Sequence, residues 1–244
     1  MGVIVRRDTV AQAFFVALFA LFALAGCSRD PALVLTSWEL EAPDAPRVLV
    51  TLPVHLDHEL PARRSRYVLR TSVALPPDLR GRQLTFAIPI LYAPCTLLAN
   101  GRRMAPLDVG TTRDYRGNGH PRWTIPEDAT SVPALDLELD HTWTQSAWLD
   151  APPRLSATSE GDATYLAVTG TTDFGAALGF TAVALGVPLY LGMFLLDRRR
   201  VAYAWWTVQM LSGILYPAFV LGLTPRLFGI YDAPVMSVGL CLCV

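Results

Sequence analysis

The sequence predicts an all-β sandwich outside the cytoplasm, followed by α-helical transmembrane segments. Three observations carry this prediction: short runs of alternating apolar residues between positions 47 and 141, two uncharged apolar blocks at 174–196 and 201–223, and a basic hinge between the blocks. A helix of about 20 apolar residues crosses a hydrocarbon core of about 30 Å. Each block is therefore long enough to span a membrane.

The hinge orients the chain. It consists of Asp197 and the triplet Arg198, Arg199 and Arg200, which is too short to cross a membrane, so the two blocks should form a helical hairpin. Short loops rich in Arg stay on the cytoplasmic side. The residues before 174 and those after 223 are therefore expected outside, with the hairpin in the bacterial inner (cytoplasmic) membrane.

A third apolar run, residues 234–244, is a partial span. At 1.5 Å per residue it reaches about half way across a bilayer. We expect the chain to be truncated, as the front of a longer multi-span protein. The alternative is that this run forms a short amphipathic cap on the outer surface.

Residues 1–27 read as a signal peptide. Arg6 and Arg7 precede an apolar run at 11–25 of signal-peptide length. The following Leu24-Ala25-Gly26-Cys27 resembles a bacterial lipobox, which implies lipidation of Cys27. Ordinary cleavage and an uncleaved anchor remain open, and all three alternatives export the residues that follow.

The exported region, residues 28–173, has the pattern of an antiparallel sandwich. Apolar residues alternate with period two in short runs separated by Pro, Gly and Asn-Gly. The expected strands are 47–52, 67–75, 83–90, 96–99, 123–125, 134–141 and 163–169. Because Cys95 is the one cysteine of this region, no disulfide can form within it.

Two stretches carry a resemblance to known families. Residues 75–86 (LPPDLRGRQLTF), with the later Leu98-Ala99-Asn100-Gly101, resemble the galactose-binding-like jelly roll of β-glucuronidase-type hydrolases. Continued by Trp123-Thr124-Ile125-Pro126 and a pair of membrane helices, the pattern is similar to bacterial seven-transmembrane receptors with diverse intracellular signalling modules. The resemblance runs from about Tyr67 to the end of the chain, and it implies a sensor joined to a membrane domain.

The best ligand-site candidate is the Gly-rich loop at 111–123. It combines Arg113, Asp114, Tyr115, His120 and Trp123. Binding residues concentrate on loops of rigid scaffolds, and aromatic rings beside charged groups suit a polar ligand such as a sugar. The alternative is a surface loop without a binding role.

Other clusters are weaker. Residues 55–58 (HLDH) have metal-ligand residue types, but a solvated loop is the better interpretation. Asp140-His141 with Ser146 contains triad residue types without the G-x-S-x-G turn of a hydrolase. We therefore expect no catalytic residue, no metal and no cofactor.

These expectations combine into a function. The chain is expected to be the periplasmic sensor and first transmembrane helices of a signal-transduction receptor that detects a small ligand, with a carbohydrate as the leading class. A net charge of −1 with no basic patch excludes nucleic acid as a partner, and homodimerisation stays open. The alternatives are a membrane-anchored carbohydrate-binding or adhesion module without signalling, and a membrane-bound glycan hydrolase whose catalytic part is missing.

Overall fold

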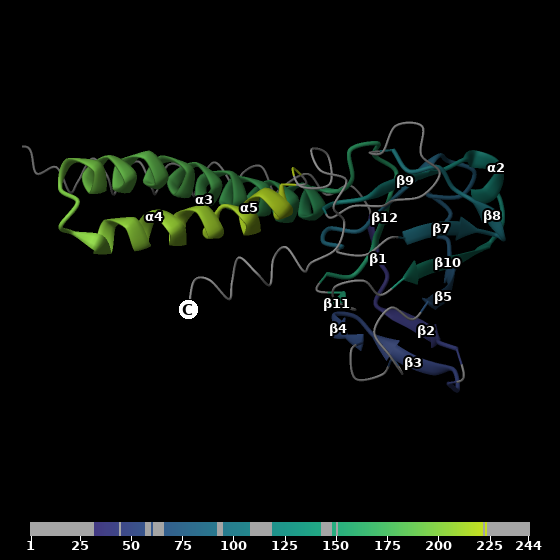
Figure 1. Cartoon of the computed structure of the whole chain (residues 1–244). Helices are drawn as coiled ribbons and strands as arrows, with labels where there is room; N and C mark the ends of the chain where they lie inside the picture. Colours follow the sequence, from purple (N-terminus) through teal and green to yellow (C-terminus); the bar gives the residue numbers. More distant parts are fainter. Residues whose placement is uncertain are drawn as a thin grey trace, which may run out of the picture.

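A computed structural model describes residues 32–43, 45–56, 60, 66–91, 95–107, 119–142, 148–149, 151–221 and 223. In this part of the chain, a β-sandwich leads directly into a bundle of apolar helices (Figure 1). The signal peptide, Cys27 and the apolar run at 234–244 lie outside the described residues, so the predictions for them stay predictions.

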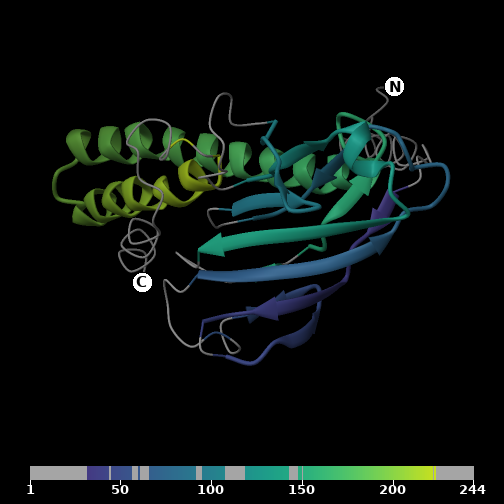
Figure 2. The ribbon, with the colours of Figure 1, turned by 90° about the vertical axis from the view of Figure 1, so that its right-hand side faces the viewer.

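Two antiparallel sheets form the sandwich (Figure 2). The larger has the order β3 (Val48–Thr51), β2 (Ser37–Glu41), β5 (Arg66–Ala74), β10 (Ala134–Thr142), β7 (Cys95–Ala99), β8 (Arg102–Arg103). The smaller has the order β1 (Ala32–Val34), β12 (Arg154–Ser156), β6 (Leu84–Ala87), β9 (Arg122–Ile125). A further pair joins β11 (Trp148–Leu149) to β4 (Val54–His55), and one short helix, α2, spans Glu127–Thr130.

The centre of the larger sheet is the pairing of β5 with β10, whose register runs from Ala134↔Ala74 to Thr142↔Arg66. Along β10, Leu135, Leu137 and Leu139 are buried while the intervening residues reach the surface. This alternation follows from the period of two in a strand. It gives the larger sheet one face toward the core and one charged face toward solvent.

Aromatic side chains fill the space between the sheets. Trp38 from β2, Phe86 from β6 and Trp123 from β9 have no exposed surface. Phe86 contacts both tryptophans, with ring centroids 6.5 Å from Trp38 and 5.8 Å from Trp123. Because these rings come from both sheets, they hold the two layers together.

The structure confirms the coarse fold class. The described part is a jelly-roll-like β-sandwich followed by apolar helix, and six of the seven expected strands are present within a residue or a few. The Asn100-Gly101 turn also forms: it joins β7 to β8 with φ of 49° and 74°. Positive φ at both central residues is what an Asn-Gly hairpin turn supplies.

The strand expected at 163–169 is wrong, because these residues are helical. They form the start of α3 (Ala163–Leu196). Asp162 is the N-cap residue, and its carboxylate accepts a hydrogen bond from the Tyr165 N–H at 3.3 Å. An Asp in this position favours helix initiation, so α3 begins before the apolar block and continues through it without a break.

α3 is the one helix in the described part of the chain that is long and apolar enough to cross a membrane. Its 34 residues correspond to about 51 Å, more than the hydrocarbon core of about 30 Å requires. Pro188 lies inside α3 without interrupting it. The additional length is at the N-terminal end, where α3 contacts the sandwich.

The second apolar block forms α4 (Val201–Gly213) and α5 (Leu215–Val220), which run back along α3 (Figure 1). The interruption at Ile214 has a chemical reason: Pro217 has no N–H with which to bond the carbonyl of Gly213 four residues earlier. A Cβ at Gly186 of α3 would lie 3.2 Å from Met210 Sδ. Glycine therefore permits the close approach of α3 and α4.

Candidate functional site

The predicted loop site is described only at its end. Arg113, Asp114 and Tyr115 lie outside the described residues, so their role in binding stays a prediction. His120 and Trp123 are described. The Trp123 ring is fully buried against Phe86, so it presents no surface to a ligand.

His120 lies where the sandwich meets α3. Its Nδ1 contacts the carbonyl oxygen of Pro89, and its Nε2 lies 3.1 Å from Oδ1 of Asp173 in α3. The hydroxyl of Tyr165 donates to the backbone oxygen of His120 at 2.7 Å. His120 is thus engaged in joining the two parts of the molecule.

Of the other predicted clusters, Asp140 and His141 are described and do not come together. Asp140 and His141 are neighbours in β10 and so point to opposite faces of the sheet. Asp140 pairs outside with Arg66, at 2.8 and 2.6 Å, while His141 is buried beneath Tyr67 in a stacked arrangement at 5.1 Å. Ser146 and residues 57–58 lie outside the described part, and within that part no group of three or more metal-ligating side chains occurs.

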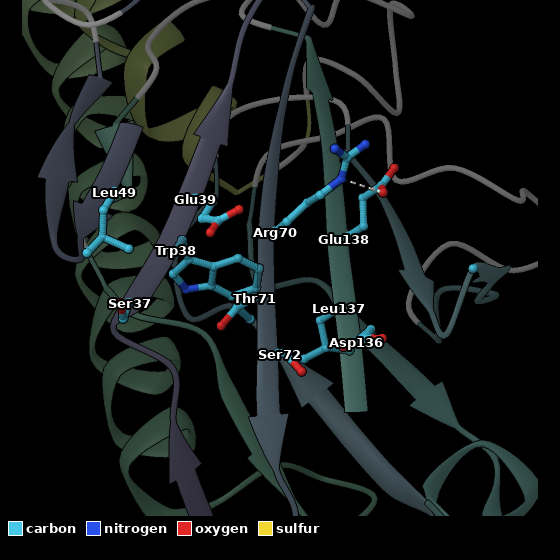
Figure 3. A pocket seen from close by; sticks show the side chains of 11 residues that line it. Ser37, Trp38, Glu39, Leu49, Arg70, Thr71, Ser72, Asp136, Leu137 and Glu138 are labelled. Carbon is cyan, nitrogen blue, oxygen red and sulfur yellow. Dashed lines mark hydrogen bonds and ion pairs between the residues drawn. The ribbon is translucent and has the colours of Figure 1, made fainter. Parts of the chain in front are cut away.

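A depression on the outer face of the larger sheet is the candidate ligand site (Figure 3). It has a volume of about 480 Å³, within the range of small-ligand pockets. It crosses β2, β5 and β10, which place Glu39, Arg70 and Glu138 side by side because Arg70 is in register with both acids. We call it the outer groove; it is lined by Ser37, Trp38, Glu39, Leu49, Arg70, Thr71, Ser72, Gly101, Asp136, Leu137 and Glu138.

The predicted Asn-Gly turn forms one rim of the outer groove. Asn100 donates its backbone N–H to the Asp136 carbonyl at 2.8 Å, and its Oδ1 accepts the Asp136 N–H at 3.0 Å. Its side-chain amide also donates to the Ala129 carbonyl at 2.8 Å. These bonds fix the turn against β10, so the rim beside Asp136 is preorganised.

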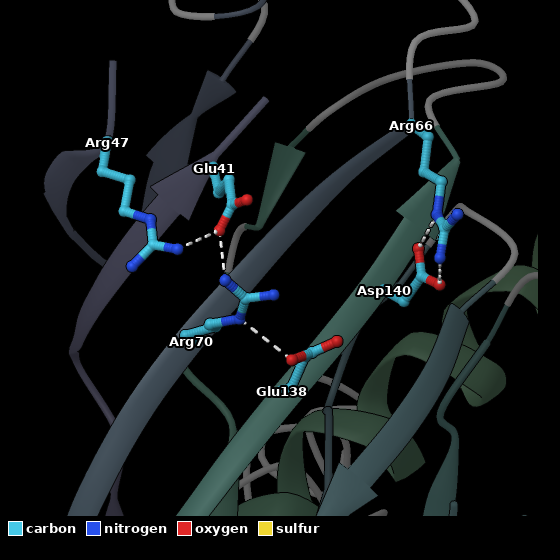
Figure 4. A network of polar contacts seen from close by, with 6 residues as sticks. All are labelled: Glu41, Arg47, Arg66, Arg70, Glu138 and Asp140. Carbon is cyan, nitrogen blue, oxygen red and sulfur yellow. Dashed lines mark hydrogen bonds and ion pairs between the residues drawn. The ribbon is translucent and has the colours of Figure 1, made fainter. Parts of the chain in front are cut away.

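Ion pairs order the groove's upper wall (Figure 4). The Arg70 guanidinium donates to Glu138 at 2.9 Å and also bonds Glu41, which in turn accepts from Arg47 at 3.0 Å. The hydrogen bond to Glu138, together with the negative charges of Glu138 and Glu41, raises the pKa of Arg70. Arg70 is thus held as a cation whose charge is already neutralised by its neighbours.

The groove's chemistry suits recognition of a polar molecule. Ser37 and Ser72 share the outer face of the sheet with Glu39 and Asp136, and their hydroxyls and carboxylates together offer both donors and acceptors. With three carboxylates against one paired Arg, the lining favours neutral or cationic ligands over anions.

Sequence reasoning did not identify this groove, although a signal was present. In the strands at 66–74 and 134–142, charged residues share one face: Arg66 and Arg70 in the first strand, and Asp136, Glu138 and Asp140 in the second. Two charged rows that pair across a sheet form a charged face. The sequence analysis considered only the apolar positions of these strands and therefore missed the charged face.

A second set of contacts fastens the sandwich to α3. Arg154 in β12 donates two hydrogen bonds to Asp162, at 2.6 and 2.5 Å. The side chains are only 15% and 7% exposed, and the paired geometry is the strong form of an Arg–carboxylate interaction. Because Asp162 also caps α3, one side chain joins the last strand of the smaller sheet to the first turn of the helix.

No protein-family model matches the chain, and no curated protein matches it. Solved structures with a similar part include a β-glucuronidase from Ruminococcus gnavus, with a TM-score of 0.43, 11% identity, and coverage of 54% of this chain and 29% of that one. A β-D-mannosidase from Dictyoglomus thermophilum has a TM-score of 0.37, 11% identity, and coverage of 46% and 15%.

A β-galacturonidase from Eisenbergiella tayi, solved with galacturonate bound, has a TM-score of 0.41, 8% identity, and coverage of 54% and 25%. The chain thus spans less than a third of the length of each of these enzymes. Likeness at this level says nothing about what this chain binds or does.

Proposed function

We propose that this chain is the extracytoplasmic sensor and the first transmembrane helices of a bacterial signal-transduction receptor. The sandwich detects a small polar ligand, for which we propose a neutral carbohydrate, and the outer groove is its site. The apolar blocks at 174–196 and 201–223 are the first two spans, the run at 234–244 begins a third, and an output module follows on the cytoplasmic side.

The observation that carries the proposal is the junction with α3. A domain that only needs to stay attached to a membrane can hang from a flexible linker, which permits reorientation. Here the helix begins within the sandwich, is capped by Asp162 and is fastened through Arg154, Tyr165 and His120. A rearrangement of the sandwich therefore moves α3, which favours a receptor over an anchored module without signalling.

The ligand class is argued from the lining of the outer groove. A neutral polyol presents hydroxyls that donate to the carboxylates of Glu39 and Asp136 and accept from Ser37 and Ser72. A uronic acid would bring its own carboxylate against three others, and Arg70 is already engaged by Glu138 and Glu41. Ligand binding can shift the equilibrium between two arrangements of the sandwich on α3 only if the ligand binds one arrangement more tightly than the other.

Calorimetry on the full chain in lipid nanodiscs tests the site. Neutral mono- and oligosaccharides are titrated beside the matching uronic acids, with wild type and Asp136→Asn. We expect a neutral saccharide to bind, the uronic acids to bind more weakly, and Asp136→Asn to weaken binding about tenfold, because a hydrogen bond to a charged group is lost.

The control is Asp78→Asn, which removes an exposed carboxylate from the turn after β5 and should leave binding unchanged. Equal binding by Asp136→Asn and wild type would remove the outer groove as the site. A complete lack of binding across the panel would remove the carbohydrate proposal, while leaving the fold and its attachment to α3 untouched.

A further inference from the structure

His120 is held in place from three sides. Its neighbour Gly119 exchanges two backbone hydrogen bonds with Leu91, at 3.0 and 3.1 Å, and Pro121 accepts the Ile88 N–H at 3.0 Å. The Tyr165 hydroxyl binds the His120 carbonyl from α3. These bonds fix the backbone that carries the imidazole, so the ring stays within reach of Pro89 and Asp173.

Both ring nitrogens face groups that only accept hydrogen bonds. Nδ1 contacts the carbonyl oxygen of Pro89, and Nε2 faces the Asp173 carboxylate at 3.1 Å. A neutral imidazole carries one N–H, whereas an imidazolium carries two. Only the protonated ring satisfies both acceptors, and the neutral ring turns a lone pair toward one of them.

We propose that His120 is a proton-binding site through which extracytoplasmic pH controls how tightly the sandwich holds the first turns of α3. Protonated, the ring bridges Pro89 in the sandwich to Asp173 in α3. A neutral ring either loses the hydrogen bond to Asp173 or keeps it without the attraction between opposite charges, so in both cases it holds α3 less tightly. This adds a response to pH to the proposed receptor, and it depends on the junction alone, whichever ligand the outer groove takes.

In the part of the chain that the structure describes, the junction carries charged groups on β9, β12 and α3. Asp173 of α3 contacts the ring, and the nearby Arg122 of β9 is paired with Glu160 at 3.2 Å. The neighbouring ion pair of Arg154 and Asp162 is mutually neutralised. Asp173 is thus the charge that changes its interaction when the ring binds a proton.

The test is hydrogen exchange of amides 164–172 in the full chain in lipid nanodiscs between pH 5 and pH 8. Wild type is compared with His120→Gln at each pH, so the intrinsic pH dependence of exchange cancels in the ratio. Glutamine does not titrate here, and the Tyr165 bond to the backbone remains. We expect wild type to be about fivefold better protected relative to the variant at pH 5 than at pH 8.

The pH window separates His120 from His141, because burial lowers the pKa of His141 to about 4. His55→Gln and His58→Gln serve as controls for the two remaining histidines. Asp173→Asn should reduce the pH dependence of amide protection as His120→Gln does. It tests the same contact if the His120→Gln variant folds poorly. A protection ratio equal at both pH values, or changed as much by His55→Gln, would overturn the proposal.

Discussion

Among single residues, His141 has the environment with the clearest consequence. It is fully buried, stacked on Tyr67, and its Nε2 lies 3.8 Å from Cys95 Sγ. Within the described part of the chain its Nδ1 has no hydrogen-bond partner. Burial, which outweighs the opposing charge of Asp140, lowers its pKa from 6.5 to about 4, so the folded sandwich holds it neutral.

This environment predicts an acid-sensitive sandwich. Between pH 6.5 and pH 4 the imidazole of His141 is protonated in the unfolded chain but neutral in the folded chain. The free energy of unfolding therefore falls as pH falls through this window, and the contribution of His141 is fully present above it. The contribution lost between pH 7 and pH 4.5 is about 2 to 3 kcal/mol. Urea unfolding in detergent micelles, followed by tryptophan fluorescence, measures it.

His141→Phe is the matched variant, since a phenyl ring keeps the stacking on Tyr67 and does not titrate. We expect it to be at least as stable as wild type at pH 7 and to lose less stability at pH 4.5, because no buried imidazole then has to be protonated. If wild type and His141→Phe lost the same free energy on acidification, another group would be responsible.

Single residues also explain why the candidate site escaped sequence reasoning. The loop at 111–123 attracted attention because aromatic and charged residues cluster there. In the structure Trp123 is fully buried and belongs to the core, and His120 contacts Asp173 of α3 and belongs to the junction. The outer groove takes its residues from four strands, β2, β3, β5 and β10, and from the turn at Gly101. Which of these residues lie side by side depends on the register of the sheet, and a single sequence does not specify that register.

At the scale of elements, the start of α3 is the critical connection. Asp162→Ala would leave the largely buried Arg154 guanidinium without its partner and remove the N-cap. An unpaired buried charge is strongly destabilising, and a lost cap adds about 1 kcal/mol. We expect a total loss of about 3 kcal/mol in the same urea experiment.

Two comparisons make this prediction specific. Asp162→Asn keeps an oxygen that can cap the helix, so it should lose less than Asp162→Ala. Arg102→Ala breaks the exposed pair with Asp128, in which both side chains are about two-thirds exposed, and should have no measurable effect. An Asp162→Ala variant as stable as Arg102→Ala would show that the junction is not held by this pair.

Strands were predictable where the pattern was unambiguous. The run at 134–141 alternates strictly, and the run at 67–75 places apolar residues such as Leu69, Val73 and Leu75 on one face. Both are long strands of the larger sheet. The run at 163–169 misled because its buried residues, Tyr165 and Thr169, are four apart, a spacing that fits both a strand and a helix. The Asp at its N-cap, which marks the helix start, is the local signal that decides between the two.

At the scale of the whole molecule, the surface divides into two kinds. The sandwich presents charged rows, whereas α3 and α4 present large apolar side chains such as Phe174, Leu185, Leu196 and Trp205, each more than 60% exposed. An apolar surface of this extent is unfavourable in water. In the receptor that we propose, a bilayer around the helices covers this surface, and the junction residues lie at the outer edge of the membrane.

The central proposal is that the sandwich lies outside the cytoplasm and that the hinge with its three arginines lies in the cytoplasm. Alkaline phosphatase, which is active only after export, is fused after Gly161 and, separately, after Arg199 in cells that express the chain. We predict high activity for the fusion at Gly161 and background activity for the fusion at Arg199. Activity at Arg199 with none at Gly161 would invert the topology and contradict the receptor.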